Sequence, residues 1–205
     1  MSRNYDETHE KILESAKKNF LTNGYERTNL RKICKDANVT TGAFYCHFKD
    51  KEKLFGELVN PVVKATVKMY TNSIQQHFDL IETGELIKVF QLSEDTLILI
   101  IEFIYDNFDI FKLLFTCADG TPYSSYLDEA VRMDVHETTR FLQEIKKRKI
   151  AVNELEEDEM HMLIHSYYSS LSEIVMHDYK KEVALKYART LIKFFNSGWH
   201  AILGI

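Results

Sequence analysis

The chain has 205 residues, with 26 Lys or Arg against 31 Asp or Glu, so that its formal net charge is −5. It contains seven Gly and two Pro, whereas average usage would give roughly 25 such residues over this length. So few chain breakers argue against a sheet fold with many tight turns and predict long helices. The hydrophobic and charged fractions, 45% and 28%, are those of a folded domain rather than of a disordered chain. Taken as a whole, the acidic charge argues against nucleic acid as a partner.

The three cysteines, Cys34, Cys46 and Cys117, are isolated from one another and form no C-x-x-C pair. They therefore indicate neither a zinc site nor a disulfide framework, and they fit a reducing compartment. Residues 1–20 are polar and charged, without the apolar core of a signal peptide. No run of about 20 apolar residues is available to span a bilayer. These features predict a soluble, cytoplasmic protein with no membrane partner.

Apolar residues recur at three- and four-residue steps along most of the chain, which is the pattern of one face of a helix. Near the N-terminus, for example, Ile12, Ala16 and Phe20 share such a face. The pattern predicts an all-α fold of about nine helices, with one or two of them in the fifth segment. The expected segments are residues 6–22, 28–36, 40–48, 50–78, 85–106, 108–116, 122–149, 154–178 and 181–203.

Capping residues and chain breakers set the expected helix ends. Asn23-Gly24 ends the first helix, because both residue types tolerate the left-handed backbone of a C-terminal cap. Pro61 predicts a kink or a local break inside the fourth helix. Thr121-Pro122 is expected to start the seventh helix, with Thr as cap and Pro at the first helical position. Asn153 with Glu156 three residues later is a cap signal for the eighth.

The charge is unevenly distributed along the chain. Residues 1–60 contain 11 basic and 9 acidic groups, whereas the remaining 145 residues contain 15 basic and 22 acidic ones. The acidity of the chain therefore belongs to its larger, C-terminal part, and the first part is weakly basic. Two functional regions are expected, with a boundary near residues 55–60.

Residues 28–48 (TNLRKICKDANVTTGAFYCHF) predict two short helices joined by a tight turn. Ala37 is small where the two helices must approach, and Asn38 suits a left-handed turn position. Val39 and Phe44 are placed to lock the pair together from inside. This arrangement is typical of a helix-turn-helix, whose second helix enters the major groove of DNA.

At this point the sequence resembles the TetR family of bacterial transcriptional regulators over residues 8–58. The resemblance is carried by the amphipathic first helix and by an ordered series of motifs: Gly24-Tyr25 and Thr28, Ile33-x-x-x-Ala37-x-Val39, Gly42-x-Phe44-Tyr45-x-His47-Phe48, and Lys51-x-x-Leu54. It implies a DNA-binding domain over residues 1–55 and a helical ligand-binding and dimerisation domain over residues 56–205. It implies no enzymatic activity and no cofactor.

The resemblance, read together with residue chemistry, gives a set of expected DNA contacts. Hydroxyls and free N–H groups at the start of the recognition helix suit phosphate, as do a tyrosine hydroxyl, a histidine and the lysine that matches the family's phosphate-binding lysine. A small apolar side chain suits a thymine methyl, and arginine suits a base or a phosphate. The expected set is Thr28, Asn29, Arg31, Thr40, Thr41, Gly42, Ala43, Tyr45, His47 and Lys51. Phe44, Phe48 and Cys34 are expected in the core instead.

Two positions depart from the family pattern. Many members have a basic or larger polar residue at the position of Thr41, and a bulkier one at that of Cys46. Both residues are small and uncharged here. Few direct contacts to bases are therefore expected, and the shape of the DNA is expected to contribute more of the specificity.

The last two predicted helices carry apolar stripes that are broader than one internal seam needs. In TetR-like proteins these helices pair with their copies as a four-helix bundle, which implies a two-fold dimer. The expected interface consists of Ile164, Tyr167, Leu171, Ile174, Ala184, Ala188, Leu191, Phe195, Gly198 and Ile202. The alternative is that both stripes pack only within one chain.

Residues 85–150 are unusually aromatic, which makes a cavity for an apolar or planar ligand a reasonable expectation. The candidate lining residues are Phe90, Phe103, Phe108, Phe111, Phe115, Tyr123, Tyr126 and Phe141. The alternative for each of them is an ordinary place in the core. His161 and His165 have metal-ligand spacing, but two ligands do not make a zinc site, and no metal is expected.

The sequence thus predicts a dimeric, ligand-responsive transcriptional regulator, in the first instance a repressor. It would bind a palindromic operator in double-stranded DNA and be released by a small-molecule effector. One alternative is an all-α carrier or enzyme that uses the aromatic compartment and keeps a vestigial DNA-binding region. Another is a purely structural dimer. No Gly-rich phosphate loop, nucleophile elbow or paired-carboxylate motif supports an enzyme.

Overall fold

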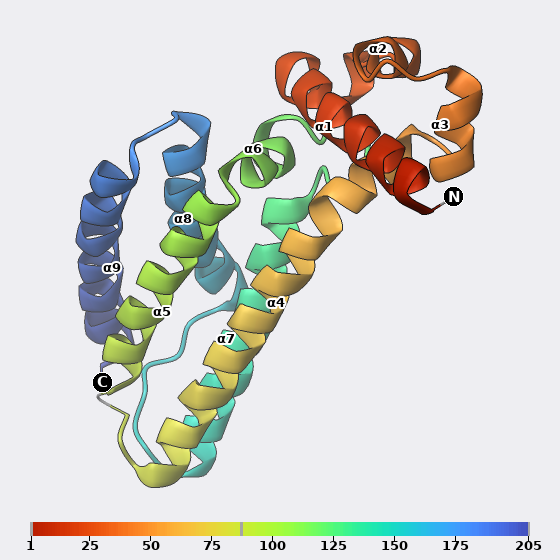
Figure 1. Cartoon of the computed structure of the whole chain (residues 1–205). Coiled ribbons are helices and arrows are strands. Elements are labelled where there is room, and N and C mark those ends of the chain that lie inside the picture. The colour runs from red at the N-terminus through yellow and green to blue at the C-terminus, as the bar shows by residue number, and fades with distance from the viewer. Residues whose placement is uncertain (1, 87, 205) are drawn as a thin grey trace. The chain divides into compact units, whose positions relative to one another are not determined.

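The computed structural model describes residues 2–86 and 88–204. Within these residues the chain is all-α, with nine helices and no strand (Figure 1), as the sequence predicts. The helices are α1 (Ser2–Arg27), α2 (Leu30–Asp36), α3 (Thr41–His47), α4 (Lys51–Thr83), α5 (Lys88–Asp106), α6 (Phe108–Thr116), α7 (Tyr126–Lys147), α8 (Glu157–Met176) and α9 (Lys181–Leu203).

Most of the expected helix ends are confirmed. Helices α6 and α9 have the predicted bounds, and α2 and α3 differ from them by a residue or two. Helix α1 is continuous to Arg27 by its hydrogen bonds, but Gly24 within it has φ 75° and ψ 163°, which is not helical. The regular part of α1 therefore ends at the predicted Asn23-Gly24, because glycine adopts this backbone without a Cβ clash.

The expected break at Pro61 does not occur. Helix α4 continues through Pro61 from Lys51 to Thr83, although the proline ring removes one backbone donor. Its neighbours Val59 and Val62 are buried, and the side chain of Asn60 accepts a hydrogen bond of 2.9 Å from the Tyr123 hydroxyl. Packing on this stretch thus outweighs the single lost backbone hydrogen bond.

Two predicted helix starts are wrong. Thr121 accepts a hydrogen bond from the Tyr123 amide (3.1 Å) and donates one to the Ala118 carbonyl (2.6 Å), so it closes a turn, and α7 begins later, at Tyr126. Asn153 donates through Nδ2 to the Ile202 carbonyl (2.9 Å) and therefore caps the end of α9 instead of the start of α8. The capping box of α8 is formed by Glu156 and Glu159.

The chain divides into two compact units. Unit 1 comprises Met1–Ala65 and Asn107–Ser125, and unit 2 comprises Thr66–Asp106 and Tyr126–Ile205. The first half of α4 belongs to unit 1 and its second half to unit 2. Helix α6 packs against α1, which is why unit 1 includes a segment far along the chain. The functional division at residues 55 and 56 stays a prediction.

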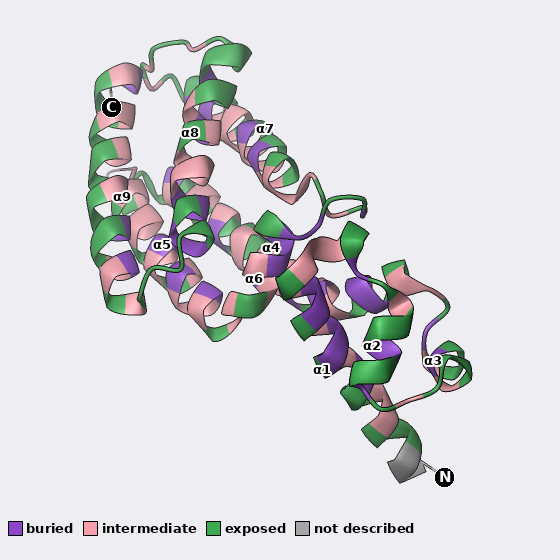
Figure 2. Cartoon of the chain, turned by 90° about the horizontal axis from the view of Figure 1, so that it is seen from above, coloured by how far each residue is buried: buried purple, intermediate pink, exposed green. Residues whose placement is uncertain are grey.

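Unit 1 is built around a small aromatic core. Phe20 and Phe55 are fully buried, with their ring centroids 5.3 Å apart in an edge-to-face arrangement. Helix α1 packs against α2 and α6, and α2 packs against α3. Figure 2 shows the buried positions of α1 along the side that faces its neighbours in this unit. This core fixes the position of the short helices α2 and α3.

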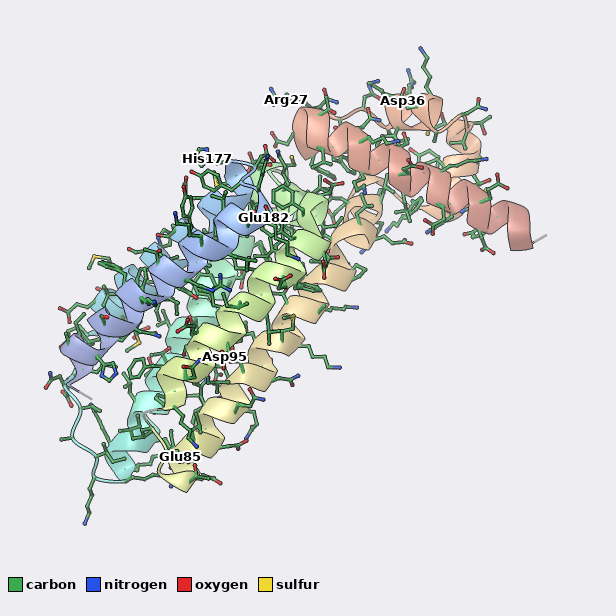
Figure 3. The ribbon with its side chains drawn as sticks, turned by 60° about the vertical axis from the view of Figure 1, so that its left-hand side comes forward. Arg27, Asp36, Glu85, Asp95, His177 and Glu182 are labelled. Carbon is green, nitrogen blue, oxygen red and sulfur yellow. The ribbon has the colours of Figure 1, made fainter. Side chains whose placement is uncertain are left out.

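Unit 2 is a bundle in which α5 packs against α9, α7 against α8, and α8 against α9. Leu97, Ile101, Val131 and Ile145 are fully or almost fully buried in it. Figure 3 marks the two ends of this bundle, with Glu85 at the α4–α5 turn and His177 and Glu182 beside the α8–α9 turn.

We expect Phe20→Ala to destabilise the protein by about 3–5 kcal/mol, because the substitution leaves a cavity in the core of unit 1. Tyr45→Ala is the matched control, since Tyr45 lies in the same unit and is 59% exposed; its effect should stay within about 0.5 kcal/mol. Urea denaturation followed by circular dichroism measures both. Equal losses for the two variants would contradict this account of the core.

Candidate nucleic-acid interface and ligand cavity

Three residues fix the start of α2, the start of α3 and the turn that joins these two helices. Asn29 caps α2 by accepting a hydrogen bond from the Arg31 amide at 2.8 Å, and Thr40 caps α3 by accepting one from the Ala43 amide at 3.1 Å. Asn38 has φ 55°, the left-handed conformation predicted for the turn. The amide of Val39 donates to the Cys34 carbonyl at 2.9 Å and closes this turn.

Phe44 locks the pair from inside, as predicted. Its side chain is completely buried, and its ring centroid lies 5.5 Å from that of Phe48, which is 2% exposed. Cys34 is also buried. The remaining positions of α3 face solvent and form the exposed surface of this helix, namely Thr41, Gly42, Tyr45 and Cys46, with Thr40 preceding them and Ala43 half-buried. Arg31 is exposed on α2.

Two of the expected DNA-contact residues have structural roles instead. Thr28 is 4% exposed, and its hydroxyl donates to the Gly24 carbonyl at 2.6 Å, so it cannot reach a phosphate in this conformation. The side-chain oxygen of Asn29 is engaged as the cap of α2. Both residues shape the start of the helix-turn-helix.

His47 is also a correction to the sequence-based expectation. Its ring lies 3.9 Å from the ring of Tyr5 and 5.5 Å from that of His9, so it packs against α1. Burial, together with the neighbouring His9, lowers the pKa of His47. A neutral, half-buried imidazole is a weak partner for phosphate. His47 therefore joins α3 to α1.

Lys51 holds three carbonyl groups. Its Nζ donates to the carbonyls of Tyr25 (2.8 Å), Thr28 (3.1 Å) and Glu26 (3.3 Å), and it lies 4.1 Å from the centroid of the Tyr25 ring. Burial lowers the pKa of its ammonium group. All three N–H donors are thus engaged within unit 1, and the structure gives Lys51 a positioning role where the family resemblance implies a phosphate contact.

Unit 2 contains a cavity of about 230 Å³ that α4, α5, α7, α8 and α9 line together. Of the eight aromatic residues predicted to line a ligand compartment, Phe90 and Phe141 do so. Phe108, Phe111, Phe115 and Tyr123 belong to unit 1, because α6 and the loop that follows it pack there. Phe103 and Tyr126 belong to unit 2 but do not line this cavity.

Sequence reasoning missed several polar residues of the cavity, above all Asp134. Its carboxyl oxygen accepts hydrogen bonds from the Tyr70 hydroxyl at 3.0 Å and from the Thr138 hydroxyl at 3.4 Å. The Tyr168 hydroxyl also hydrogen-bonds to this carboxyl group, and burial raises its pKa. A signal was present in the sequence, because Asp134 interrupts the apolar stripe of α7 beside the buried Val131 and Val135.

A second missed polar group is His77, on the part of α4 that lines the cavity. Its Nδ1 lies 2.9 Å from the Ser73 carbonyl, to which it donates, and its Nε2 lies 3.2 Å from the Ser93 hydroxyl. Burial lowers the pKa of the imidazole. The ring is therefore held as a neutral group at the cavity wall.

The predicted dimer residues fall into three groups, two of which share Ile164. Ile164, Leu171, Ile174, Ala184 and Ala188 are buried within the single chain, so packing inside unit 2 accounts for their apolar stripes. Ile164, Tyr167 and Phe195 line the cavity, and their expected place at a dimer interface stays a prediction. Leu191, Gly198 and Ile202 are half-buried and stay candidates. Four exposed apolar residues also lie on these two helices: Met162, Met176, Tyr187 and Phe194.

The rings of His161 and His165 lie 6.0 Å apart on α8. Over residues 2–86 and 88–204, no group of three or more His, Cys, Asp or Glu side chains is arranged to hold a metal ion. In the same part of the chain, no helix combines the length and the apolar character needed to cross a bilayer.

The fold and the site together define a class: an all-α helix-turn-helix protein with a separate helical unit that contains a cavity. Residues 12–58 match the family model described as bacterial regulatory proteins, tetR family. The HTH-type transcriptional regulator AcrR of Shigella flexneri is 48% identical over 52 residues, which are 25% of this chain and 24% of the relative. A probable acrEF/envCD operon repressor of Escherichia coli K12 is 33% identical over 72 residues, 34% of this chain and 33% of the relative.

These matched segments span only about a quarter to a third of the curated relatives. Over nearly the whole chain, the crystal structure of a transcriptional regulator from Aquifex aeolicus VF5 aligns with a TM-score of 0.60 and 20% identity, covering 91% of this chain and 98% of that one. That alignment shows a shared fold. Over residues 12–58 the chain is similar to bacterial regulatory proteins of the tetR family.

The positioning role of Lys51 predicts a loss of stability even without DNA. We expect Lys51→Met to destabilise the protein by about 1–3 kcal/mol, because three carbonyls lose a charged donor. Lys53→Met is the matched control, since Lys53 is exposed two residues further along α4. Thermal unfolding of both variants checks the prediction, and an unchanged stability of Lys51→Met would argue against the positioning role.

Proposed function

We propose that this chain is a dimeric transcriptional repressor that binds a palindromic DNA operator and is released by a small-molecule effector. The observation that carries the proposal is the helix-turn-helix of residues 28–48, with a fully buried Phe44 behind α3 and an uninterrupted solvent-facing surface in front of it. A relative's description as an operon repressor supports repression as the direction of control. Bacterial regulators of this kind meet DNA in the cytoplasm, which is therefore the proposed location.

The reading surface consists of Thr40, Thr41, Gly42, Ala43 and Tyr45. Thr40 and Thr41 place hydroxyls and backbone N–H groups at the N-terminus of α3, where phosphate oxygens are favoured. Gly42 permits close approach of the backbone. Tyr45 is 59% exposed and has a hydroxyl free to reach a phosphate.

Charge near this surface supports DNA as the partner. Exposed Arg31, Lys35, Lys49 and Lys53 lie on or next to α2 and α3. Residues 1–60 are weakly basic although the chain as a whole is acidic. Non-specific DNA affinity comes mainly from such charges, so the acidic remainder would limit it.

The small contact area of one recognition helix on DNA supports a dimer. One seven-residue recognition helix makes few contacts, whereas two copies about one helical turn of DNA apart, roughly 34 Å, read a palindrome. On α9, Tyr187, Leu191, Phe194 and Gly198 recur at steps of four, three and four, and Phe194 is 73% exposed. We propose this stripe, together with Met162 and Met176 of α8, as the dimer interface.

The effector would occupy the cavity of unit 2. Helix α4 begins four residues after α3 and continues as one helix to Tyr70 and His77 at the cavity wall. A ligand that favours one arrangement of this helix would shift the dimer away from the spacing that DNA requires. The alternative, a carrier with a vestigial DNA-binding region, predicts a ligand that leaves DNA affinity unchanged.

The proposal predicts sequence-preferring binding to DNA that flanks the chain's own coding region. Tyr45→Phe should weaken binding by about tenfold, and on all sequences alike, because one phosphate contact is lost from each protomer. Tyr179→Phe is the matched control, since Tyr179 is a partly exposed tyrosine of unit 2. Mobility-shift assays at low salt measure both. A folded dimer without sequence preference would contradict the function.

The dimer surface predicts that Phe194→Glu weakens association by about thirtyfold or more, because a central buried aromatic contributes roughly 2 kcal/mol and a carboxylate must then be buried. Leu99→Glu is the matched control, since Leu99 is 61% exposed and belongs to α5, not to the α8 and α9 stripe. Sedimentation velocity over a concentration series measures both. Loss of the dimer in the Leu99 variant alone would place the interface elsewhere.

A further inference from the structure

The cavity of unit 2 has an unbalanced charge. Two acidic residues, Asp134 and Glu137, lie among the residues that line it, and within the described part of the chain no lysine or arginine lines it with them. The single basic residue there is His77, whose pKa is lowered by burial. The wall thus offers negative charge and apolar surface but no positive charge.

The two carboxyl groups differ in how they are neutralised. Glu137 forms an ion pair with Arg140, whose guanidinium also lies 5.1 Å from the centroid of the Phe78 ring. At this edge of the cavity, the chain's own cation therefore meets a carboxylate and an aromatic ring together. Such a combination is favourable because the face of the ring carries negative charge density.

Asp134, in contrast to Glu137, has no cation beside it among the residues that the structure describes. Its hydrogen-bond partners are neutral hydroxyls from three helices, Tyr70 of α4, Thr138 of α7 and Tyr168 of α8. Among the described side chains, none of opposite charge lies within ion-pair distance of its carboxyl oxygens. Hydroxyl donors favour the ionised carboxylate, whereas its burial opposes the charge and raises the pKa. A half-buried acid in this state gains most from a cation that brings its own apolar surface.

Aromatic rings supply that apolar surround. Tyr70, Phe90, Phe141, Tyr167, Phe195 and Trp199 all line the cavity. A cation held over such rings gains a further attraction that grows when water is excluded. The volume of about 230 Å³ lies just below the usual range for ligand pockets, roughly 300–1,000 Å³, and favours a compact ligand.

We propose that the effector is a compact organic cation, such as a substituted ammonium with an apolar or aromatic group, whose charge is neutralised by Asp134. This inference rests on the proposed function, since it names the chemical class of the molecule that releases the repressor. It also makes a statement about binding alone that is tested without DNA.

A matched pair of probes isolates the charge. Benzyltrimethylammonium and neopentylbenzene have the same shape and differ in a positively charged nitrogen against a neutral carbon. Trp199 is the chain's one tryptophan and lines the cavity, so quenching of its fluorescence reports occupancy. We expect the cation to bind the unmodified protein at least about tenfold more tightly than the neutral probe.

Asp134→Asn should remove this preference and keep the shape, because the amide oxygen still accepts from the neighbouring hydroxyls. We expect the affinity for benzyltrimethylammonium to fall about tenfold or more, with the affinity for neopentylbenzene unchanged. Asp128→Asn, at an exposed position of the same helix, should change neither affinity. Circular dichroism confirms that each variant is folded, and the comparison of the two probes on unmodified protein needs no variant at all.

Equal affinities for the two probes, tighter binding of the neutral one, no quenching by the cation at millimolar concentration, or an unchanged cation affinity in Asp134→Asn would each overturn the inference. Mobility shifts on operator DNA without any probe test the proposed function separately. Cation binding without DNA binding would overturn the repressor and keep the cation site. DNA binding without cation binding would overturn the cation site and keep the repressor.

Discussion

The ammonium group of Lys51 is the contact on which the geometry of unit 1 depends. It holds the carbonyls of Tyr25, Glu26 and Thr28, which lie at the end of α1 and just before α2. It belongs to the first turn of α4, the element that follows α3. One side chain therefore joins both ends of the segment that contains the helix-turn-helix, and satisfies carbonyls that a helix end leaves without partners.

The remaining constraints in unit 1 act around this contact. Thr28 turns its hydroxyl inward to Gly24, and Gly24 provides the non-helical backbone that redirects the chain near the end of α1. Asn38 provides the left-handed turn, and the buried Phe44 fixes the rotation of α3 about its axis. Because these residues face inward, Thr40, Thr41, Gly42 and Tyr45 are left on the outside. The surface that we propose contacts DNA therefore consists of the positions that do not take part in this packing.

Local signals predict this part well and unit 2 less well. Caps, turn residues and the period of apolar residues act within a few positions, so α2, α3, α6 and α9 follow from sequence. Long-range packing does not. Phe111 and Phe141 are equally plausible cavity residues by composition, and only the placement of α6 in unit 1 separates them. Ala184 and Ala188 likewise resemble a dimer seam until their burial within one chain is known.

Lys51 and Asp134 illustrate the difference between a charged group that stabilises the fold and one that we propose binds a ligand. Both are half-buried, and burial disfavours the charged form of each. Lys51 is compensated by three carbonyl dipoles of its own unit, so its environment is complete. Asp134 has hydroxyls but, among the described residues, no countercharge, and it lines an open volume. An incomplete environment costs stability unless something else completes it, and the cation that we propose as effector would do so.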